Sequence, residues 1–84
     1  MSILSNLATC RDDIEDYMHD VDGIYQHVHS CWEITRNANL ISGGLSDDID
    51  ALSSFLDTLD DLSRDLRNAF RECCNAVEYA KNIM

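Results

Sequence analysis

Four residues of this chain have a spacing that metal or acid–base chemistry uses. Asp16 and His19 stand three residues apart, the carboxylate-to-histidine spacing of di-iron helices. His29 and Glu33 stand four residues apart and share one face of a helix, so they weakly resemble a metal clip. A di-iron site needs further glutamates that face inward, whereas we expect Asp16 and His19 to face solvent. A solvated helix surface is the simpler interpretation of both pairs.

Other catalytic and binding motifs do not fit the sequence. Asp20-x-Asp22-Gly23 resembles part of a calcium loop, but the first position of that loop would be Met18 and the twelfth His29. The chain contains no nucleophile elbow and no phosphate-binding loop. We therefore predict that the protein is not an enzyme and has no catalytic residues, no metal ligands and no cofactor.

Four cysteines, Cys10, Cys31, Cys73 and Cys74, carry the remaining reactive groups. The adjacent Cys73 and Cys74 match no common zinc-ligand spacing. Cys10, Cys31 and Cys73 fall at apolar positions of the pattern described below, where a free thiol acts as a small hydrophobe. We expect reduced thiols in the core of a cytosolic protein. A Cys10–Cys74 disulfide and an intermolecular contact through Cys31 are the alternatives.

The charge balance argues against several classes of partner. The chain has 84 residues, with 6 Lys and Arg against 16 Asp and Glu, and a net charge of −10. Nucleic acids and anionic membranes attract clustered cations, so we expect neither as a partner. No apolar run approaches the roughly 18 residues of a membrane span, and residues 1–6 lack the features of a secretory signal. We expect a cytoplasmic protein, or one exported by a system that needs no signal peptide.

Hydrophobic residues recur with a period of 3.5, which is typical of helices that pack along a coiled-coil-like seam. Gly43 suits the left-handed conformation that follows many helix C-termini, and Ser46 can cap the next helix. With no proline and only 3 glycines, the chain is expected to form helices over 3–41 and 46–83. The short turn makes them antiparallel neighbours. We predict an all-α fold, a two-helix hairpin that forms a single domain over residues 1–84.

Alternating steps of four and three residues place the predicted seam on one side of each helix. All of its positions except Thr35 and Ser63 are apolar. The seam of helix one comprises Ile3, Leu7, Cys10, Ile14, Tyr17, Val21, Ile24, Val28, Cys31, Thr35 and Ala38. The seam of helix two comprises Leu45, Ile49, Leu52, Leu56, Leu59, Ser63, Leu66, Phe70, Cys73, Val77, Ala80 and Met84.

Further apolar residues flank this seam and would leave stripes on both edges of a lone hairpin. Helix one presents Met18, Tyr25 and Trp32 on one edge, and helix two presents Phe55 and Leu62 on the other. Exposed aromatic and aliphatic stripes invite further helices. We predict that these five residues bind a helical partner protein or a second copy, which completes a four-helix bundle. The alternative is a monomer whose edge residues fold down over the seam.

Acidic residues crowd the first half of helix one and the end that carries the turn. Antiparallel pairing should bring the first group alongside Arg64, Arg67 and Arg71, which would neutralise part of its charge. The group at the turn has no such company: Asp47, Asp48, Asp50, Asp57, Asp60 and Asp61. This negative end either keeps the chain in solution or steers a basic partner to the turn.

In outline the chain resembles the Trp-X-Gly hairpin family of type VII secretion and the small helical partners of its toxins. A short, acidic hairpin with few cysteines carries this resemblance. Where the family has Trp-X-Gly at the turn, this chain has Ser42-Gly43-Gly44, and its Trp32 lies upstream. The export motif Tyr-x-x-x-Asp/Glu would begin at Tyr79 but meets Ile83. The resemblance implies a four-helix bundle and a role as export substrate or targeting partner. Type III secretion needle subunits and their co-chaperones are similar hairpins.

Three functions are compatible with this pattern. The first is a protein–protein interaction module, a small helical partner, chaperone or targeting factor for a secreted or larger helical protein. The second is a self-assembling structural coiled-coil subunit. The third is an acidic inhibitor or immunity-type protein that occupies a basic site.

Overall fold

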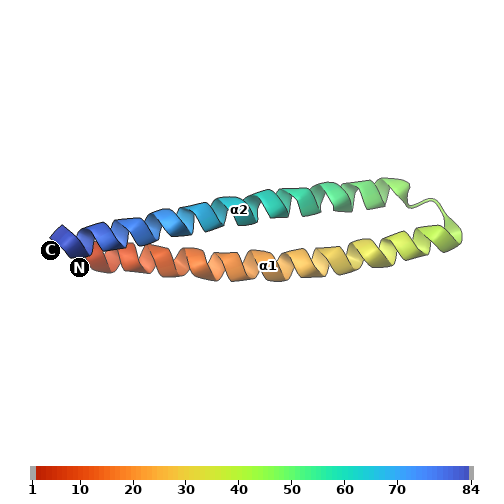
Figure 1. The fold of residues 1–84 in the computed structure, drawn as a ribbon. Helices are drawn as coiled ribbons and strands as arrows, with labels where there is room; N and C mark the ends of the chain where they lie inside the picture. Colours follow the sequence, from red (N-terminus) through yellow and green to blue (C-terminus); the bar gives the residue numbers. More distant parts are fainter. Residues whose placement is uncertain (1, 84) are drawn as a thin grey trace.

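The computed structural model describes residues 2–83 as two long antiparallel helices (Figure 1). Helix α1 comprises Ile3–Ser42 and α2 comprises Ser46–Ile83. Both chain ends lie at one end of the hairpin, which measures 64 × 15 × 13 Å along its principal axes. The predicted all-α hairpin is confirmed, and α1 extends one residue beyond its predicted end. The predicted seam position Met84 lies outside the described residues.

Both ends of α1 are set by residues that favour helix termini. A serine caps the N-terminus, and two glycines follow the C-terminus. The Ser2 hydroxyl accepts from the Ser5 amide at 3.0 Å, an N-cap that satisfies one free amide of the first turn. At the other end, Gly43 has a φ of 71° and Gly44 a φ of 84°. Residues with a Cβ rarely adopt this left-handed backbone, so the two glycines allow the chain to reverse.

Asn39 stabilises the turn through both its backbone and its side chain. Its backbone carbonyl accepts from the Gly43 amide at 2.8 Å, and its side-chain oxygen accepts from the Leu45 amide at 2.8 Å. The Leu45 carbonyl accepts from the Ile49 amide at 3.0 Å, so the capping position of α2 falls on Leu45. The expected cap by the Ser46 hydroxyl is absent from the hydrogen bonds of residues 2–83.

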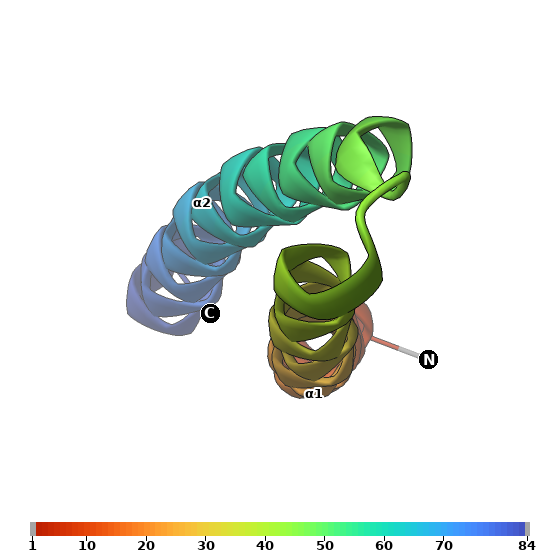
Figure 2. The same ribbon diagram turned by 90° about the vertical axis from the view of Figure 1, so that its right-hand side faces the viewer.

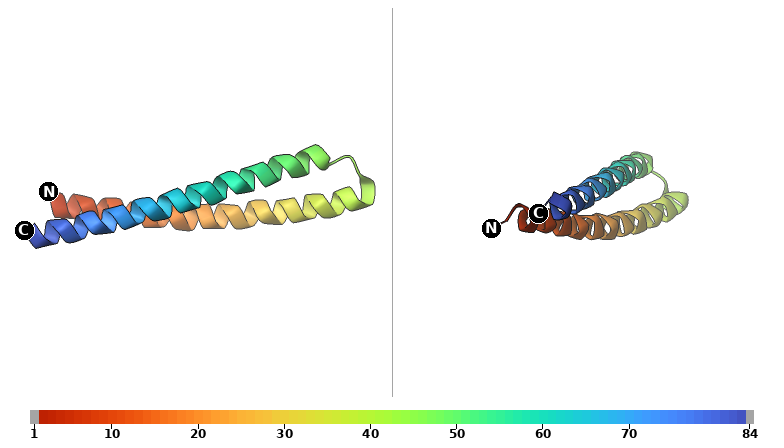
Figure 3. Two further views of the ribbon diagram at one scale, coloured as in Figure 1. Left: turned by 45° about the horizontal axis from the view of Figure 1, so that its top comes forward. Right: turned by 60° about the vertical axis from the view of Figure 1, so that its left-hand side comes forward.

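The two helices wind around each other instead of lying in one plane. Viewed from the turn, α2 slants past α1 instead of running parallel to it (Figure 2), and the tilted view shows the helices crossing nearer the chain ends (Figure 3). A seam that repeats every 3.5 residues drifts slowly around a helix of 3.6 residues per turn. The helices must therefore coil to keep such a seam in contact.

Helix α2 faces α1 with the seam that its sequence predicts. Its buried residues are Leu56, Leu59, Val77 and Ala80. The other predicted seam positions from 45 to 80 are half-buried, including the polar Ser63. The prediction succeeds for α2 because most of its leucines are concentrated on this one side.

Helix α1 is rotated relative to its predicted seam. One predicted row faces α2 as expected, with Val21 buried and the rest half-buried: Leu7, Ile14, Val21, Val28 and Thr35. The other predicted row is exposed from the helix start to residue 31: Ile3, Cys10, Tyr17, Ile24 and Cys31. A neighbouring, half-buried row takes its place: Leu4, Arg11, Met18, Tyr25, Trp32 and Asn39.

The rotation allows α2 to cover the larger side chains of α1. Trp32 offers far more apolar area than Cys31, which the predicted seam would have buried in the same turn. The Trp32 indole Nε1 also donates to Ser53 Oγ of α2 at 2.9 Å, so its polar atom is satisfied at the interface. The Cys31 row and the Trp32 row of α1 both carry apolar residues at the same spacing. The spacing therefore allows either row to face α2, and the contacts with α2 decide which one does.

Candidate interaction surface

The rotation of α1 leaves apolar side chains in solvent beside a matching exposed row of α2. Six residues, each between 43% and 64% exposed, form what we call the apolar face: Ile3, Tyr17, Ile24, Phe55, Leu62 and Ile83. Between them lie smaller residues of the same rows: Cys10, Cys31, Ala69 and Ala76. The face spans residues 3–31 of α1 and 55–83 of α2, the part of the hairpin away from the turn. Large apolar side chains exposed in two neighbouring rows are characteristic of a binding surface.

One contact between the helices shows that both rows of the apolar face emerge on the same edge. The hydrogen bond from Trp32 to Ser53 joins the Trp32 row of α1 and the Ser53 row of α2 along one edge. Each residue turns an α-helix by about 100°. Ile24 comes one residue before Tyr25 of the Trp32 row, and Phe55 comes two residues after Ser53. Both therefore emerge at the opposite edge.

The structure separates the five residues predicted to bind a partner into two groups. Phe55 and Leu62 are exposed and belong to the apolar face. Met18, Tyr25 and Trp32 are half-buried and lie toward the other edge. The expectation that Trp32 lies off the intramolecular seam is wrong, because its indole hydrogen-bonds across the interface to α2.

The half of the apolar face that α1 contributes consists of residues that the 3.5-residue spacing predicts to be buried. Ile3, Tyr17 and Ile24 belong to the predicted seam, yet they are 64%, 57% and 47% exposed. The signal that could have found them is the excess of apolar rows in α1. Three neighbouring rows carry apolar residues and only two can face α2, so one row must remain outside.

On the edge opposite the apolar face, four side chains of α1 stack along the helix. The ring centroids of Tyr25 and His29 lie 6.2 Å apart, and those of His29 and Trp32 lie 5.7 Å apart. The Arg36 guanidinium sits 4.8 Å from the centroid of the Trp32 ring, a cation–π contact. Spacings of three and four residues bring these side chains together. We call this group the aromatic edge.

A groove of about 210 Å³ lies between the helices next to the aromatic edge. Its lining is Val21, Asp22, Tyr25, Leu59, Asp60, Ser63 and Arg67. The Arg67 guanidinium and the carboxylates of Asp22 and Asp60 thus share one groove. No ion pair crosses between the helices within residues 2–83, so this groove is a mixed polar and apolar surface without a fixed charge pair.

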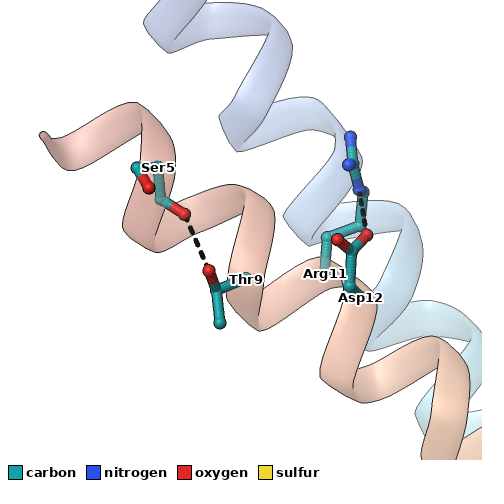
Figure 4. A network of polar contacts seen from close by, with 4 residues as sticks. All are labelled: Ser5, Thr9, Arg11 and Asp12. Atoms are coloured by element: carbon teal, nitrogen blue, oxygen red, sulfur yellow. Dashed lines mark hydrogen bonds and ion pairs between the residues drawn. The ribbon is translucent and has the colours of Figure 1, made fainter.

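Arg11 shows how a charged residue is accommodated in the row of α1 that faces α2. Its side chain is 31% exposed, and its Nε lies 3.2 Å from Asp12 Oδ1 (Figure 4). A long side chain of this kind buries its stem and keeps its charge in water. On the solvent side of the same segment, Thr9 Oγ1 donates to the Ser5 carbonyl at 3.0 Å (Figure 4).

Of the three arginines expected alongside the acidic residues of α1, Arg67 shares a groove with Asp22 of α1, whereas Arg64 and Arg71 contact residues of their own helix. Arg64 Nη2 lies 3.3 Å from Asp61 Oδ1 of its own helix, and Arg71 donates to the Asn68 side chain at 3.1 Å. Asp61 is therefore not a lone charge of the turn end. The Arg64–Asp61 pair is exposed on both sides, and exposed pairs contribute little to stability.

The cysteines occupy less buried positions than the sequence suggests. Cys10 and Cys31 are exposed, and Cys73 and Cys74 are half-buried. The expectation of core thiols is therefore wrong for Cys10 and Cys31, because the rotation of α1 turns their row outward. All four thiols are free, so the structure contains no Cys10–Cys74 disulfide.

The residues considered for metal chemistry lie on the helix surface. Asp16 and His19 are both exposed. His29 Nδ1 lies 3.7 Å from Glu33 Oε1, with both side chains about half exposed, and the His29 ring also stacks on Tyr25. Within residues 2–83, no group of three or more His, Cys, Asp or Glu side chains could hold a metal ion. Neither helix in this range has an apolar stretch long enough to span a bilayer.

No protein-family model, curated protein or solved structure matches the chain. What it shares with the Trp-X-Gly hairpin family is therefore the antiparallel two-helix shape, without a sequence match.

Proposed function

We propose that this chain is a non-enzymatic interaction module whose apolar face binds another helical protein and completes a four-helix bundle. The observation that carries the proposal is the row of apolar residues on each helix, with large side chains exposed in both rows and both rows on the same edge of the hairpin. Since each row repeats every seven residues, as each row of the intramolecular seam does, a second helical layer can interdigitate with the two rows.

The small size of the core supports the same proposal. Among residues 2–83, only five side chains are buried: Val21, Leu56, Leu59, Val77 and Ala80. Small domains bury a low fraction of their surface and are marginal without further burial. A partner that covers the apolar face would add buried apolar area to that of the single seam.

A more specific role follows from the sequence. We propose that the bound protein is a secreted or larger helical protein, and that this chain acts as its chaperone or targeting factor in the cytoplasm. The hairpin shape that the chain shares with small secretion partners supports this role. The apolar face, which is exposed in the isolated chain and which a partner could cover, supports it as well.

Position-specific photo-crosslinking tests the interaction. A benzophenone amino acid replaces Leu62 on the apolar face, and in a control chain it replaces Leu40, which is 79% exposed but lies on the outer side of α1. We expect a discrete cross-linked protein from position 62 and none from position 40 in the cell that makes the chain. The same partner should no longer co-purify with the Leu62→Asn variant, but it should still co-purify with the Leu40→Asn variant. Equal yields at both positions, or none at either, would contradict the proposal.

A further inference from the structure

Carboxylates border the apolar face on both of its long sides. On α1 the row next to Tyr17 and Ile24 contains Asp13 and Asp20, and on α2 the row beyond Leu62 contains Asp65 and Glu72; we call these four the flanking carboxylates. Because Trp32 lies opposite Ser53 in an antiparallel pair, Asp20 is level with Asp65 and Asp13 with Glu72.

The flanking carboxylates are available to a partner. All four are exposed, and none takes part in an ion pair among residues 2–83. The remaining residues of these two flanking rows include no further carboxylate and no lysine or arginine, and toward the turn they are the apolar or small residues Ile34, Ala51 and Thr58.

The cations of the chain all lie away from the apolar face: Arg11, Arg36, Arg64, Arg67, Arg71 and Lys81. Arg11 belongs to the Trp32 row of α1, and Arg67 and Lys81 belong to the Ser53 row of α2. Arg36 lies on the aromatic edge, over Trp32. Arg64 and Arg71 are on the outer surface of α2, on the side of the aromatic edge. The cations are thus confined to the other side of the hairpin, whereas carboxylates are present on both sides and border the apolar face without a lysine or arginine among them.

We propose that the apolar face binds a helical segment of another protein that carries lysine or arginine on both sides of its own apolar stripe. This inference rests on the proposed function and adds the chemistry of the partner. Each flanking carboxylate would face a cation of the partner at the rim of the interface, where charge complementarity selects the partner and speeds its encounter.

A second copy of this chain does not supply that complement. Packing two apolar faces together brings flanking carboxylates near one another, and no lysine or arginine borders the face of either copy. Each chain also carries a net charge of −10. A copy could offer cations only by presenting its aromatic edge, an arrangement that leaves an apolar face uncovered at the end of every assembly and continues to grow.

The dimensions of the face suit an extended helical partner. The face spans residues 3–31 and 55–83, about 42 Å along the helices, and the hairpin is 13 to 15 Å across. A partner lying along the face would therefore cover on the order of 600 Å² of this chain, not far below the ~800 Å² per partner of a standard specific interface. The two levels of flanking carboxylates are seven residues apart, about 10 Å along each helix, so a partner that covers the face reaches both of them.

Three matched amphipathic peptides test the inference. Each has about 28 residues, roughly 42 Å when helical, and the same leucine and isoleucine stripe, flanked by lysine, by glutamine or by glutamate. Fluorescence anisotropy measures their binding to the full chain at low and at moderate salt. Four exposed ion pairs should together favour the lysine peptide over the glutamine peptide about tenfold. The glutamate peptide should bind most weakly, and added salt should narrow the differences.

Two variants of equal charge show where the preference arises. Asp13→Asn, Asp20→Asn, Asp65→Asn and Glu72→Gln together remove the flanking carboxylates and should abolish the preference for lysine. The control variant neutralises four exposed carboxylates elsewhere: Asp50→Asn, Asp57→Asn, Asp60→Asn and Glu78→Gln. Because both variants change the net charge equally, the control should keep the preference. Circular dichroism verifies that each remains helical.

The outcomes separate this inference from the proposed function. If the lysine and glutamine peptides bind equally well, the apolar face binds helices but the flanking charges do not select them, and the inference fails alone. If none of the three peptides binds, the proposed function fails as well. Sedimentation of the chain without peptide gives the last outcome. A stable homodimer at low salt, or assemblies that lengthen with concentration, would show that the occupant is a second copy and would overturn the inference.

Discussion

Replacing Trp32 with alanine should destabilise the hairpin itself, whereas replacing Phe55 should have a much smaller effect. A fully buried tryptophan costs about 3–5 kcal/mol on truncation, and Trp32 is half-buried, so we expect about 2 kcal/mol from lost burial. The lost hydrogen bond to Ser53 adds about 0.5–1 kcal/mol. The higher helix propensity of alanine returns about 0.5 kcal/mol. The net loss should be about 2–2.5 kcal/mol.

Phe55 is 47% exposed, and its side chain has no polar atom, so its removal leaves no hydrogen-bonding group without a partner. We expect Phe55→Ala to lower the free energy of unfolding of the isolated chain by at most about 1 kcal/mol, because much of its ring remains in water. Urea unfolding followed by circular dichroism at two protein concentrations measures both variants. The two concentrations distinguish a loss of hairpin stability from a loss of association.

A double-mutant cycle isolates the contact between the helices. Trp32→Phe and Ser53→Ala each remove the hydrogen bond, and combining them should give a coupling energy of about 1 kcal/mol. A larger cost for Phe55→Ala than for Trp32→Ala, with no coupling between Trp32 and Ser53, would refute the orientation of α1. Such a result would mean that the Cys31 and Ile24 row faces α2, as the 3.5-residue spacing first predicts.

Three further predictions concern the turn and the helix surfaces. Asn39→Ala should lower the unfolding free energy by about 1 kcal/mol in the same urea assay, since it leaves the Leu45 amide without its 2.8 Å partner. Gly43→Ala should cost about 1 kcal/mol because φ is 71°; the matched Gly23→Ala, with nothing within 4 Å, should stabilise by a similar amount, and equal effects would contradict this. Cys31 should react with a thiol reagent in the folded chain well before Cys73, and the reverse order would argue against the rotation of α1.

The local features of the fold could be predicted because neighbouring residues decide them. The glycines at positions 43 and 44 place the turn, and the absence of proline leaves two uninterrupted helices on either side. Because the turn between the two long helices is short, they are expected to pack as antiparallel neighbours. The role of Asn39 was not predicted, since its side chain acts on the backbone of Leu45 only once the turn has formed.

The candidate surface could be predicted only in part. Phe55 and Leu62 were identified because α2 has a clear seam, and residues beside a clear seam are known to lie on its edge. Ile24 and Tyr17 were assigned to the core because α1 has two apolar rows of nearly equal quality. Choosing the wrong one of these two rows in α1 predicts that the Ile24 row is buried and the Trp32 row exposed. The α1 half of the apolar face is then assigned to the core.

The order of residues along the chain was enough to establish the two helices, their turn, the buried side of α2 and the excess of negative charge. Contact between the helices was needed to choose which side of α1 is buried. The physical reason is that periodicity is a property of one helix, while burial is a property of two. The size of Trp32 and its bond to Ser53 favour one orientation, and that choice places Ile24 beside Leu62 on an exposed apolar edge bordered by carboxylates.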